Sequence, residues 1–176
     1  MKISNTPLLL LCFIIIGQLT FSQNKTLKYK NVVAENPEAE ADIKVVSDCV
    51  NSLIHNKMME VEKLLDDAYV GYGPGINDSI TKQETMASWN KTRKIRTNET
   101  VAFVTQTFRI LKGNLEENWV SQWGTYAFTQ NGKAIKLPYQ LTARVNNGKI
   151  NRSTIYYDNL ATIDTLRYQI TPPKQD

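Results

Sequence analysis

Histidine and cysteine are nearly absent from this chain of 176 residues, which has one histidine, His55, and two cysteines, Cys12 and Cys49. A zinc site needs several such ligands, so we expect no metal site, and no sequence feature predicts another cofactor. A catalytic device of the Ser-His-Asp or Cys-His type would have to use His55. This position lies near the end of a predicted helix, where the helix dipole is reason enough for a histidine.

Long apolar runs are also scarce. Residues 8–16 form a run of about nine, whereas a membrane-spanning helix needs roughly 20 apolar residues. Lys2 precedes the run, and residues 20–22 (Thr-Phe-Ser) place small side chains where a signal peptidase would cut. We therefore predict that residues 1–22 are a signal peptide and that the mature protein is periplasmic or secreted, without a membrane span.

Neither sign of charge is in large excess, since the chain has 21 lysines and arginines and 17 acidic residues. One basic cluster, over residues 91–96, contains Lys91, Arg93, Lys94 and Arg96. Aromatic residues do not alternate with these charges, so we expect no nucleic-acid partner. We interpret the cluster as a solvated connection between a helix and a sheet.

Residues 36–168 are predicted to form one domain, between a flexible lead-in (23–35) and a tail (169–176). Asn36 and Pro37 predict a helix start, because asparagine caps helices and proline fits the first helical position. The apolar stripe of this helix consists of Ile43, Val46, Val50, Leu53 and Ile54. A second helix is predicted over residues 58–65, and a capping box, Thr81 with Glu84, opens a third.

Strands dominate the remainder. They are predicted over residues 68–72, 101–111, 118–130, 134–145 and 150–157, with a short helix over 160–168. Asn131-Gly132 and Asn147-Gly148 predict tight hairpins, and Pro138 predicts a sheet edge or a bulge. The order predicts an α+β domain: a curved antiparallel sheet wrapped around about three N-terminal helices, as a cone-shaped α+β barrel with a pocket at its open end.

Two stretches, residues 64–75 (LLDDAYVGYGPG) and 147–158, resemble the SnoaL-like branch of the nuclear transport factor 2-like superfamily. Residues 123–126 (Trp-Gly-Thr-Tyr) fit a middle strand of the same family, and the resemblance covers residues 36–168. It implies a cone with an apolar pocket, often dimerised through the sheet. Members include polyketide cyclases, ketosteroid isomerases, dehydratases and non-catalytic binding domains, so the fold says little about activity.

The resemblance also implies where a catalytic base would lie. Enzymatic members carry a carboxylate or a histidine inside the cone, and ketosteroid-isomerase-like members place it near the end of the first strand. The matching stretch here, residues 70–73, offers Tyr72, which is a far weaker base at pH 7. This departure from the family pattern favours binding over isomerase chemistry.

Asp158, at the end of the last predicted strand, is the other candidate catalytic residue, with Tyr72 or Tyr156 as a hydrogen-bond donor. A carboxylate at an apolar pocket mouth can abstract a proton next to a carbonyl group. We place Asp158 on the same strand face as Thr154 and Tyr156. The alternative is that Asp158 caps the C-terminal helix.

Aromatic side chains supply the predicted pocket. We expect a small apolar or aromatic molecule to bind against Tyr72, Trp89, Trp119, Trp123, Tyr139, Tyr156 and Asp158. One strand face, Trp119 to Thr125, either leaves a cavity or meets a partner subunit. Gln122, Arg109 and Arg144 would bind a ligand oxygen only if they point inward, and we expect them to point outward.

The sequence thus favours an exported domain that binds a small apolar or amphipathic ligand without catalysis, as a homodimer formed through the sheet. Two alternatives stay open. One is a cofactor-free isomerase, cyclase or dehydratase that uses a pocket carboxylate, and the other is a dimerisation or assembly module.

Overall fold

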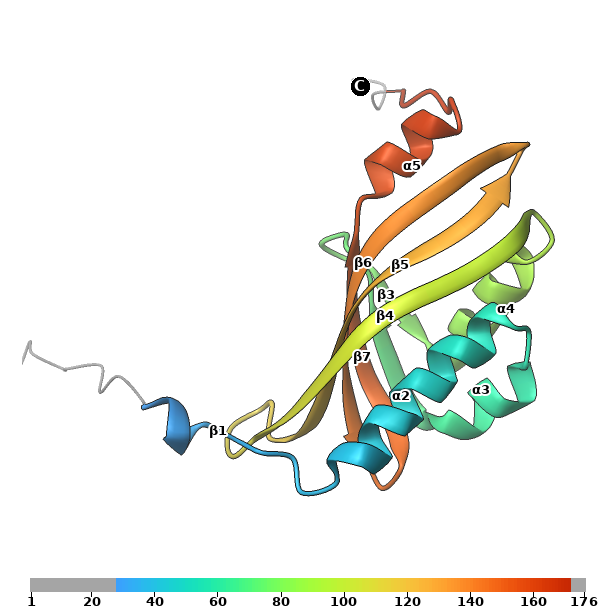
Figure 1. Cartoon of the computed structure of the whole chain (residues 1–176). Coiled ribbons are helices and arrows are strands. Elements are labelled where there is room, and N and C mark those ends of the chain that lie inside the picture. The colour runs from blue at the N-terminus through green and yellow to red at the C-terminus, as the bar shows by residue number, and fades with distance from the viewer. Residues whose placement is uncertain (1–27, 172–176) are drawn as a thin grey trace, which may run out of the picture.

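A long curved sheet carries three helices on one of its faces in the computed structural model, which describes residues 28–171 (Figure 1). The predicted signal peptide, and parts of the predicted lead-in and tail, lie outside the described residues. The helices are α2 (Ala39–Ile54), α3 (Met58–Leu64), α4 (Lys82–Thr92) and α5 (Asn159–Thr165), with a 3-10 turn η1 (Tyr29–Asn31). The strands are β1 (Val33–Ala34), β2 (Leu65–Tyr72), β3 (Ser79–Thr81), β4 (Arg96–Ile110), β5 (Glu117–Gln130), β6 (Lys133–Asn146) and β7 (Lys149–Tyr157).

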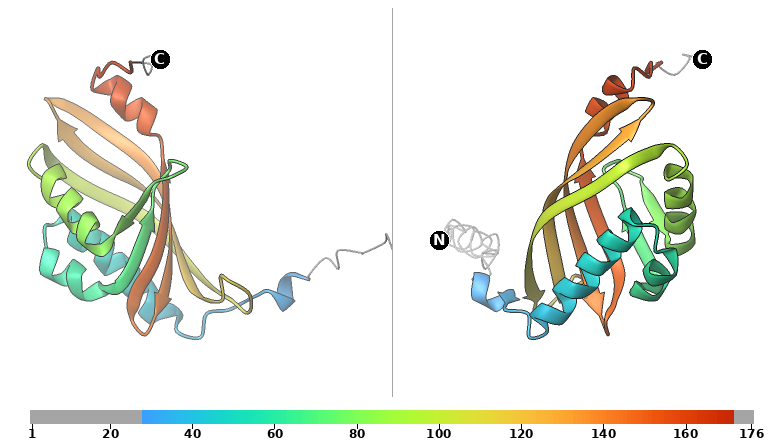
Figure 2. Two further views of the ribbon diagram at one scale, coloured as in Figure 1. Left: turned by 180° about the vertical axis from the view of Figure 1, so that it is seen from behind. Right: turned by 45° about the vertical axis from the view of Figure 1, so that its right-hand side comes forward.

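The strand order in the sheet is β1-β4-β5-β6-β7-β2-β3. Neighbouring strands are antiparallel except β2 and β7, which are parallel. Helices α2, α3 and α4 cover the concave face, and α5 follows β7 at one end of the sheet (Figure 2). The predicted α+β class, with a curved sheet around N-terminal helices, is confirmed; the sheet stays open and includes one parallel pair.

The first helix begins two residues later than its sequence predicts. Asn36 does not cap it, because Glu38 takes the N-cap position. Asn36 instead accepts a hydrogen bond from the Glu38 main-chain N–H and donates one of 2.8 Å to the carboxylate of Asp42. Asn118 of β5 donates another, of 2.9 Å, to the same carboxylate. The amide donors allow Asp42 to be buried, and they tie the helix start to the sheet.

Apolar side chains of α2, α3 and the sheet form the main core. Its buried members are Val46, Cys49, Val61, Leu65, Tyr69, Val120, Ala143, Val145 and Ile150. Burial raises the pKa of the Cys49 thiol to about 12, so this cysteine stays protonated and inert at neutral pH. A second cluster, Ile54, Tyr126, Phe128 and Ile135, extends the apolar interior toward α5.

Turn and cap signals in the sequence predict the connections well. The capping box of Thr81 and Glu84 is present at the start of α4. Both Asn-Gly pairs adopt positive φ at both residues, as a tight hairpin turn of this type requires (Asn131 52°, Gly132 73°, Asn147 50°, Gly148 70°). These local features set the lengths of β5, β6 and β7.

Pro138 lies in β6, which is an interior strand by its position in the sheet. The neighbouring strand β7 ends at Tyr157, however, and Tyr157 pairs with Tyr139. Residues 133–138 of β6 therefore pair with β5 on one side and have no β7 residue on the other side. The edge that Pro138 predicts is a local one.

Within the described part of the chain, none of the helices is long and apolar enough to cross a membrane.

Candidate functional site

A cavity of about 520 Å³ lies between the helices and the concave face of the sheet. This volume falls in the range of ligand pockets, roughly 300–1,000 Å³. The helical side of the wall comprises Val50, Leu53 and Ile54 of α2, Thr85, Ser88, Trp89 and Thr92 of α4, and Asn159 and Thr162 of α5. The sheet side includes Tyr69, Gly71, Arg96, Val101, Tyr126, Leu137, Tyr139, Leu141, Ser153, Ile155 and Tyr157. The segment from Tyr72 to Ile80 adds Gly73, Pro74, Asp78 and Ser79.

A bulge in β7 decides which of its side chains reach the cavity. Ile150 pairs with Val145 of β6 and Arg152 pairs with Arg144, so Asn151 is an extra residue in the ladder. Ile150 is buried in the core, and strict alternation would turn Arg152 inward as well. The extra residue shifts the phase by one, as β-bulges do. Ser153, Ile155 and Tyr157 consequently line the cavity.

Two of the predicted pocket residues, Trp89 and Tyr139, line the cavity with their neighbours on α4 and β6. Tyr72 also borders it, but its side chain alternates to the other face from Gly71. There the guanidinium of Arg152 lies 4.5 Å from the centre of the Tyr72 ring. Tyr72 is therefore positioned as a stacking partner of Arg152.

Trp119 and Trp123 lie on the outer face of the sheet, which turns away from the helices. Val120 and Tyr126 of the same strand point to the concave face, and alternation therefore places the tryptophans on the other face. Trp119 is buried there, with its indole N–H donating a 2.8 Å hydrogen bond to the carbonyl of Leu115. Trp123 is 41% exposed.

Tyr156 and Asp158 do not line the cavity either. The phase shift in β7 turns Tyr156 to the outer face, where it is 60% exposed, and Thr154 shares that face. The pocket position expected of Tyr156 and Asp158 is therefore not observed. Asp158 is exposed and takes the N-cap position of α5. Its carboxylate accepts a 2.8 Å hydrogen bond from the Ala161 N–H, the capping geometry that the sequence offers as the alternative.

Two tyrosines on the cavity wall have hydroxyl groups that already form hydrogen bonds within the protein. Neither is among the pocket residues that the sequence predicts. The hydroxyls of Tyr69 and Ser153 share a hydrogen bond of 2.7 Å. Burial raises the pKa of the Tyr69 phenol, and this hydrogen bond opposes the shift in part. The Tyr126 phenol donates a hydrogen bond to the carboxylate of Glu99. Burial is the larger cause of the raised pKa of Tyr126, and this hydrogen bond raises the pKa further.

Two other hydroxyl groups of the cavity wall are buried and have no hydrogen-bond partner among the described residues. They belong to Tyr139 of β6 and Thr85 of α4. Burial raises the pKa of the Tyr139 phenol to about 12, so it remains a hydrogen-bond donor at neutral pH. Buried polar groups without partners are rare in folded proteins, but both hydroxyl groups are closed to solvent and to the cavity, and that of Thr85 also approaches the Tyr69 phenol.

Among the described residues that line the cavity, Arg96 and Asp78 carry a formal charge. Arg96 donates a 3.1 Å hydrogen bond to Gln130, and its guanidinium lies 4.0 Å from the centre of the Phe128 ring. Asp78 accepts a 3.0 Å hydrogen bond from the Gly75 N–H. Neither side chain has an oppositely charged partner among the described residues.

The basic cluster contributes to the fold as well as to the surface. Arg93 donates to the carbonyls of Leu53 and Ile54, and so satisfies main-chain groups at the end of α2. Its guanidinium also lies 3.8 Å from Glu99. Lys91 and Lys94 are exposed, as expected of a solvated connection.

Among the polar strand residues, Gln122 points inward, contrary to expectation. It is fully buried, and its amide donates a 3.2 Å hydrogen bond to Ser47 of α2. Arg109 also lies on the concave face, contrary to expectation, because it pairs with Asn118 and donates a hydrogen bond to it. Arg144 lies on the outer face, as expected, and donates a hydrogen bond to Asn151 at the bulge. None of these three side chains lines the cavity, and their hydrogen bonds stabilise the fold.

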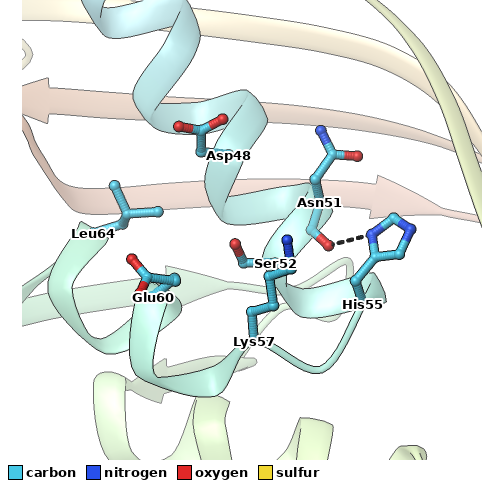
Figure 3. Close-up of a pocket in the computed structure, with 7 residues that line it drawn as sticks. All are labelled: Asp48, Asn51, Ser52, His55, Lys57, Glu60 and Leu64. Atoms are coloured by element: carbon cyan, nitrogen blue, oxygen red, sulfur yellow. Dashed lines mark hydrogen bonds between the residues drawn. The ribbon is translucent and has the colours of Figure 1, made fainter.

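A smaller, polar groove of about 290 Å³ lies between α2 and α3 (Figure 3). His55 is exposed at its border, at the C-cap of α2, with Nδ1 2.8 Å from the carbonyl oxygen of Asn51. Two groove acids, Asp48 and Glu60, are already paired with Lys44 and Lys63. Over residues 28–171 the acids, histidine and cysteine form no group of three that could hold a metal ion.

Comparison with solved structures finds the same architecture, although no protein-family model and no curated protein matches the sequence. A protein from Shewanella denitrificans OS-217 that is described as a SnoaL-like polyketide cyclase aligns with a TM-score of 0.58 at 12% identity, over 73% of this chain and 98% of that one. An NTF2-like protein from Burkholderia xenovorans LB400 aligns with a TM-score of 0.55 at 13% identity, over 72% and 96%. The chain thus has the cone fold that its sequence resemblance predicts.

An LEH-like epoxide hydrolase from Mycobacterium tuberculosis has the same fold, with a TM-score of 0.57 at 18% identity, over 74% of this chain and 92% of that one. Two of these three proteins are thus described as enzymes, a cyclase and a hydrolase, and the third by its fold alone. The fold therefore does not decide between binding and catalysis, and the side chains of the cavity must carry that argument.

The capping role of Asp158 predicts a specific pair of effects. Asp158→Ala should lower the free energy of unfolding by about 1 kcal/mol, because the Ala161 N–H loses its acceptor, whereas Asp158→Asn should keep most of the stability. Urea denaturation of both variants measures this difference. Equal losses in the two variants would contradict the capping role.

Proposed function

We propose that this protein is an exported binding protein that holds a small, largely apolar molecule in the cavity between α2, α4 and the sheet. The observation that carries the proposal is the composition of the cavity wall. Aliphatic and aromatic side chains such as Leu53, Trp89, Val101, Leu137 and Ile155 surround a space of ligand size. Burial of apolar ligand surface against such a wall is the main source of affinity.

The enzymatic alternative has less support from the side chains. Its proposed base, Asp158, is exposed and engaged as a helix cap, and its proposed donor Tyr156 is on the outer face. The carboxylate at the cavity wall, Asp78, is held by a main-chain N–H of its own loop. Binding without proton transfer is the function that this wall favours.

Filling the cavity should weaken ligand binding. The neutral fluorescent probe N-phenyl-1-naphthylamine should bind to the wild-type protein with a saturable rise in fluorescence. Ile155→Trp, which adds bulk inside the cavity, should weaken that binding at least about tenfold because the space is lost. Tyr156→Trp, one residue along and on the outer face, is the matched control and should bind the probe as the wild type does. Equal binding by all three proteins would contradict a cavity site.

Export predicts a defined processed chain. The full-length protein, expressed in a host with a secretory pathway, should be recovered with its first 22 residues removed, so that the chain starts at Gln23. Intact-mass spectrometry of the protein from the extracytoplasmic fraction measures the cleavage point. An unprocessed chain that stays in the cytoplasm would overturn the export proposal.

We further propose that the protein forms a homodimer through the outer face of its sheet. Val104, Trp123, Gln140 and Tyr156 are cross-strand neighbours in one row over β4, β5, β6 and β7. Three of them are large and exposed: Val104 71%, Trp123 41% and Tyr156 60%. An exposed apolar row of this kind is typical of an interaction surface.

The surroundings of the row also favour a second copy of the chain as its partner. Its uncharged neighbours on the same face are Ala102, Gln106, Ser121, Thr125, Pro138, Thr142 and Thr154. Lys136, Arg144 and Arg152 are charged and lie at the margins. A two-fold interface buries the same patch on both subunits, and an uncharged centre lets this happen without repulsion.

The dimer proposal predicts that a charge in the row weakens self-association. Trp123→Lys should raise the dimer dissociation constant at least about tenfold, because each subunit would bring a charge into the buried interface. Sedimentation equilibrium measures the constant, and Met59→Lys on α3, where Met59 is 76% exposed, is the matched control. A wild-type protein that stays monomeric at its highest soluble concentration would contradict the proposal.

A further inference from the structure

The last arginine of the basic cluster, Arg96, reaches the cavity because of its position in the sheet. It pairs with Gln130 of β5, and directly opposite residues of neighbouring strands point to the same face. Side chains two residues apart on a strand also share a face, so Gln130 lies on the concave face together with Phe128 and Tyr126. Arg96 therefore lies on this face as well, half-buried in the cavity wall.

The guanidinium group of Arg96 lies over the aromatic part of this wall. Its Cζ atom is 4.0 Å from the centre of the Phe128 ring and 5.6 Å from that of the Tyr126 ring, within the range of cation–π contacts. Tyr126 lines the cavity, and its ring centre lies 6.0 Å from that of Trp89, which lines the cavity as well. The positive charge is thus held beside the apolar space before any ligand arrives, which lowers the entropic cost of binding.

The charge of Arg96 is not neutralised by an ion pair with any described acid. Its Nε atom donates a hydrogen bond to the uncharged Gln130, and the guanidinium also approaches the Tyr126 hydroxyl. That hydroxyl donates its own hydrogen bond to Glu99, whose carboxylate lies 3.8 Å from the guanidinium of Arg93. Two guanidinium groups thus share the surroundings of one carboxylate, and one positive charge remains in excess.

Asp78, the other charged residue of the wall, offers a weaker attraction to a cation. It belongs to the loop between β2 and β3 and is exposed, so water and salt screen its charge. Arg96 is shielded more from solvent, and the exposed Lys91 and Lys94 of the same cluster add positive potential to it. Residues 91–99 contain four basic side chains and one acidic side chain. A ligand therefore meets an excess of positive charge at this part of the wall.

We infer that the cavity binds amphipathic anions, in which an apolar body carries one carboxylate group, and that the Arg96 guanidinium donates hydrogen bonds to this carboxylate. The planar fork of a guanidinium matches a carboxylate, and charge-assisted hydrogen bonds are stronger than neutral ones. The apolar body lies against the aliphatic and aromatic side chains of the wall, such as Trp89 and Ile155. The inference rests on the proposed cavity-binding function and narrows its ligand class.

Three naphthalene probes of similar size and different charge test the inference on the wild-type protein. At neutral pH, 2-naphthoate is an anion, 2-acetylnaphthalene is a neutral ketone and 2-naphthylmethylammonium is a cation. Isothermal titration calorimetry measures the three affinities. The naphthoate should bind at least about fivefold more tightly than the ketone, and the cation should bind most weakly, because only the anion gains an ion pair with Arg96. A ketone or a cation that binds as tightly as the naphthoate would overturn the inference while leaving cavity binding intact.

Variants of the cluster assign the effect to one side chain. Arg96→Met removes the charge and keeps an apolar stem, so it should weaken naphthoate binding at least about tenfold and leave the ketone within about twofold. Lys94→Met is the matched control. It removes the same charge from an exposed position that is not among the residues lining the cavity, and it should leave both affinities within about twofold. Arg96→Lys keeps the charge without the planar fork and should bind the naphthoate with an intermediate affinity.

The remaining outcomes separate the inference from the function on which it rests. Equal effects of Arg96→Met and Lys94→Met on the naphthoate would overturn the contact with Arg96. Ile155→Trp should weaken the naphthoate and the ketone alike, since both occupy the cavity, and an unchanged naphthoate affinity in this variant would also overturn the inference. If none of the three probes binds to the wild-type protein, the proposed binding function fails, and the inference fails with it.

Discussion

One extra residue in β7 determines how the two faces of the sheet are used. A sheet with helices on one side has an inner and an outer face, and alternation assigns each side chain to one of them. Asn151 interrupts the alternation after the buried Ile150, so that the inner face resumes at Ser153. Three features depend on this shift: the hydrogen bond between Tyr69 and Ser153, the position of Ile155 on the cavity wall, and the exposure of Tyr156.

Much of the fold could be predicted because its signals are local. The Thr81–Glu84 capping box and the two Asn-Gly turns involve few residues each, and all three occur where the sequence indicates. The parallel pairing of β2 with β7 has no comparable signal, since it joins segments far apart in the chain. Tyr69 and Ser153, which are 84 positions apart, are brought together by this pairing.

The candidate site was harder to predict than the fold because it depends on the phase of each strand. An aromatic residue is recognisable in a sequence, but the face on which it lies follows from register and bulges. Trp89 and Tyr139 reach the cavity, whereas Trp123 and Tyr156 lie on the outer face. Composition therefore indicated the right kind of wall, and the backbone geometry selected which aromatic side chains form it.

The local edge of β6 has a consequence for the behaviour of the protein in concentrated solution. Unpaired strand edges invite other chains to add a strand, which is a common route to aggregation. Beyond the end of β7, Pro138 supplies no N–H to such an intruding strand, and the neighbouring Lys136 is exposed and charged. The sequence thus protects the one stretch of a long central strand that its neighbour leaves uncovered.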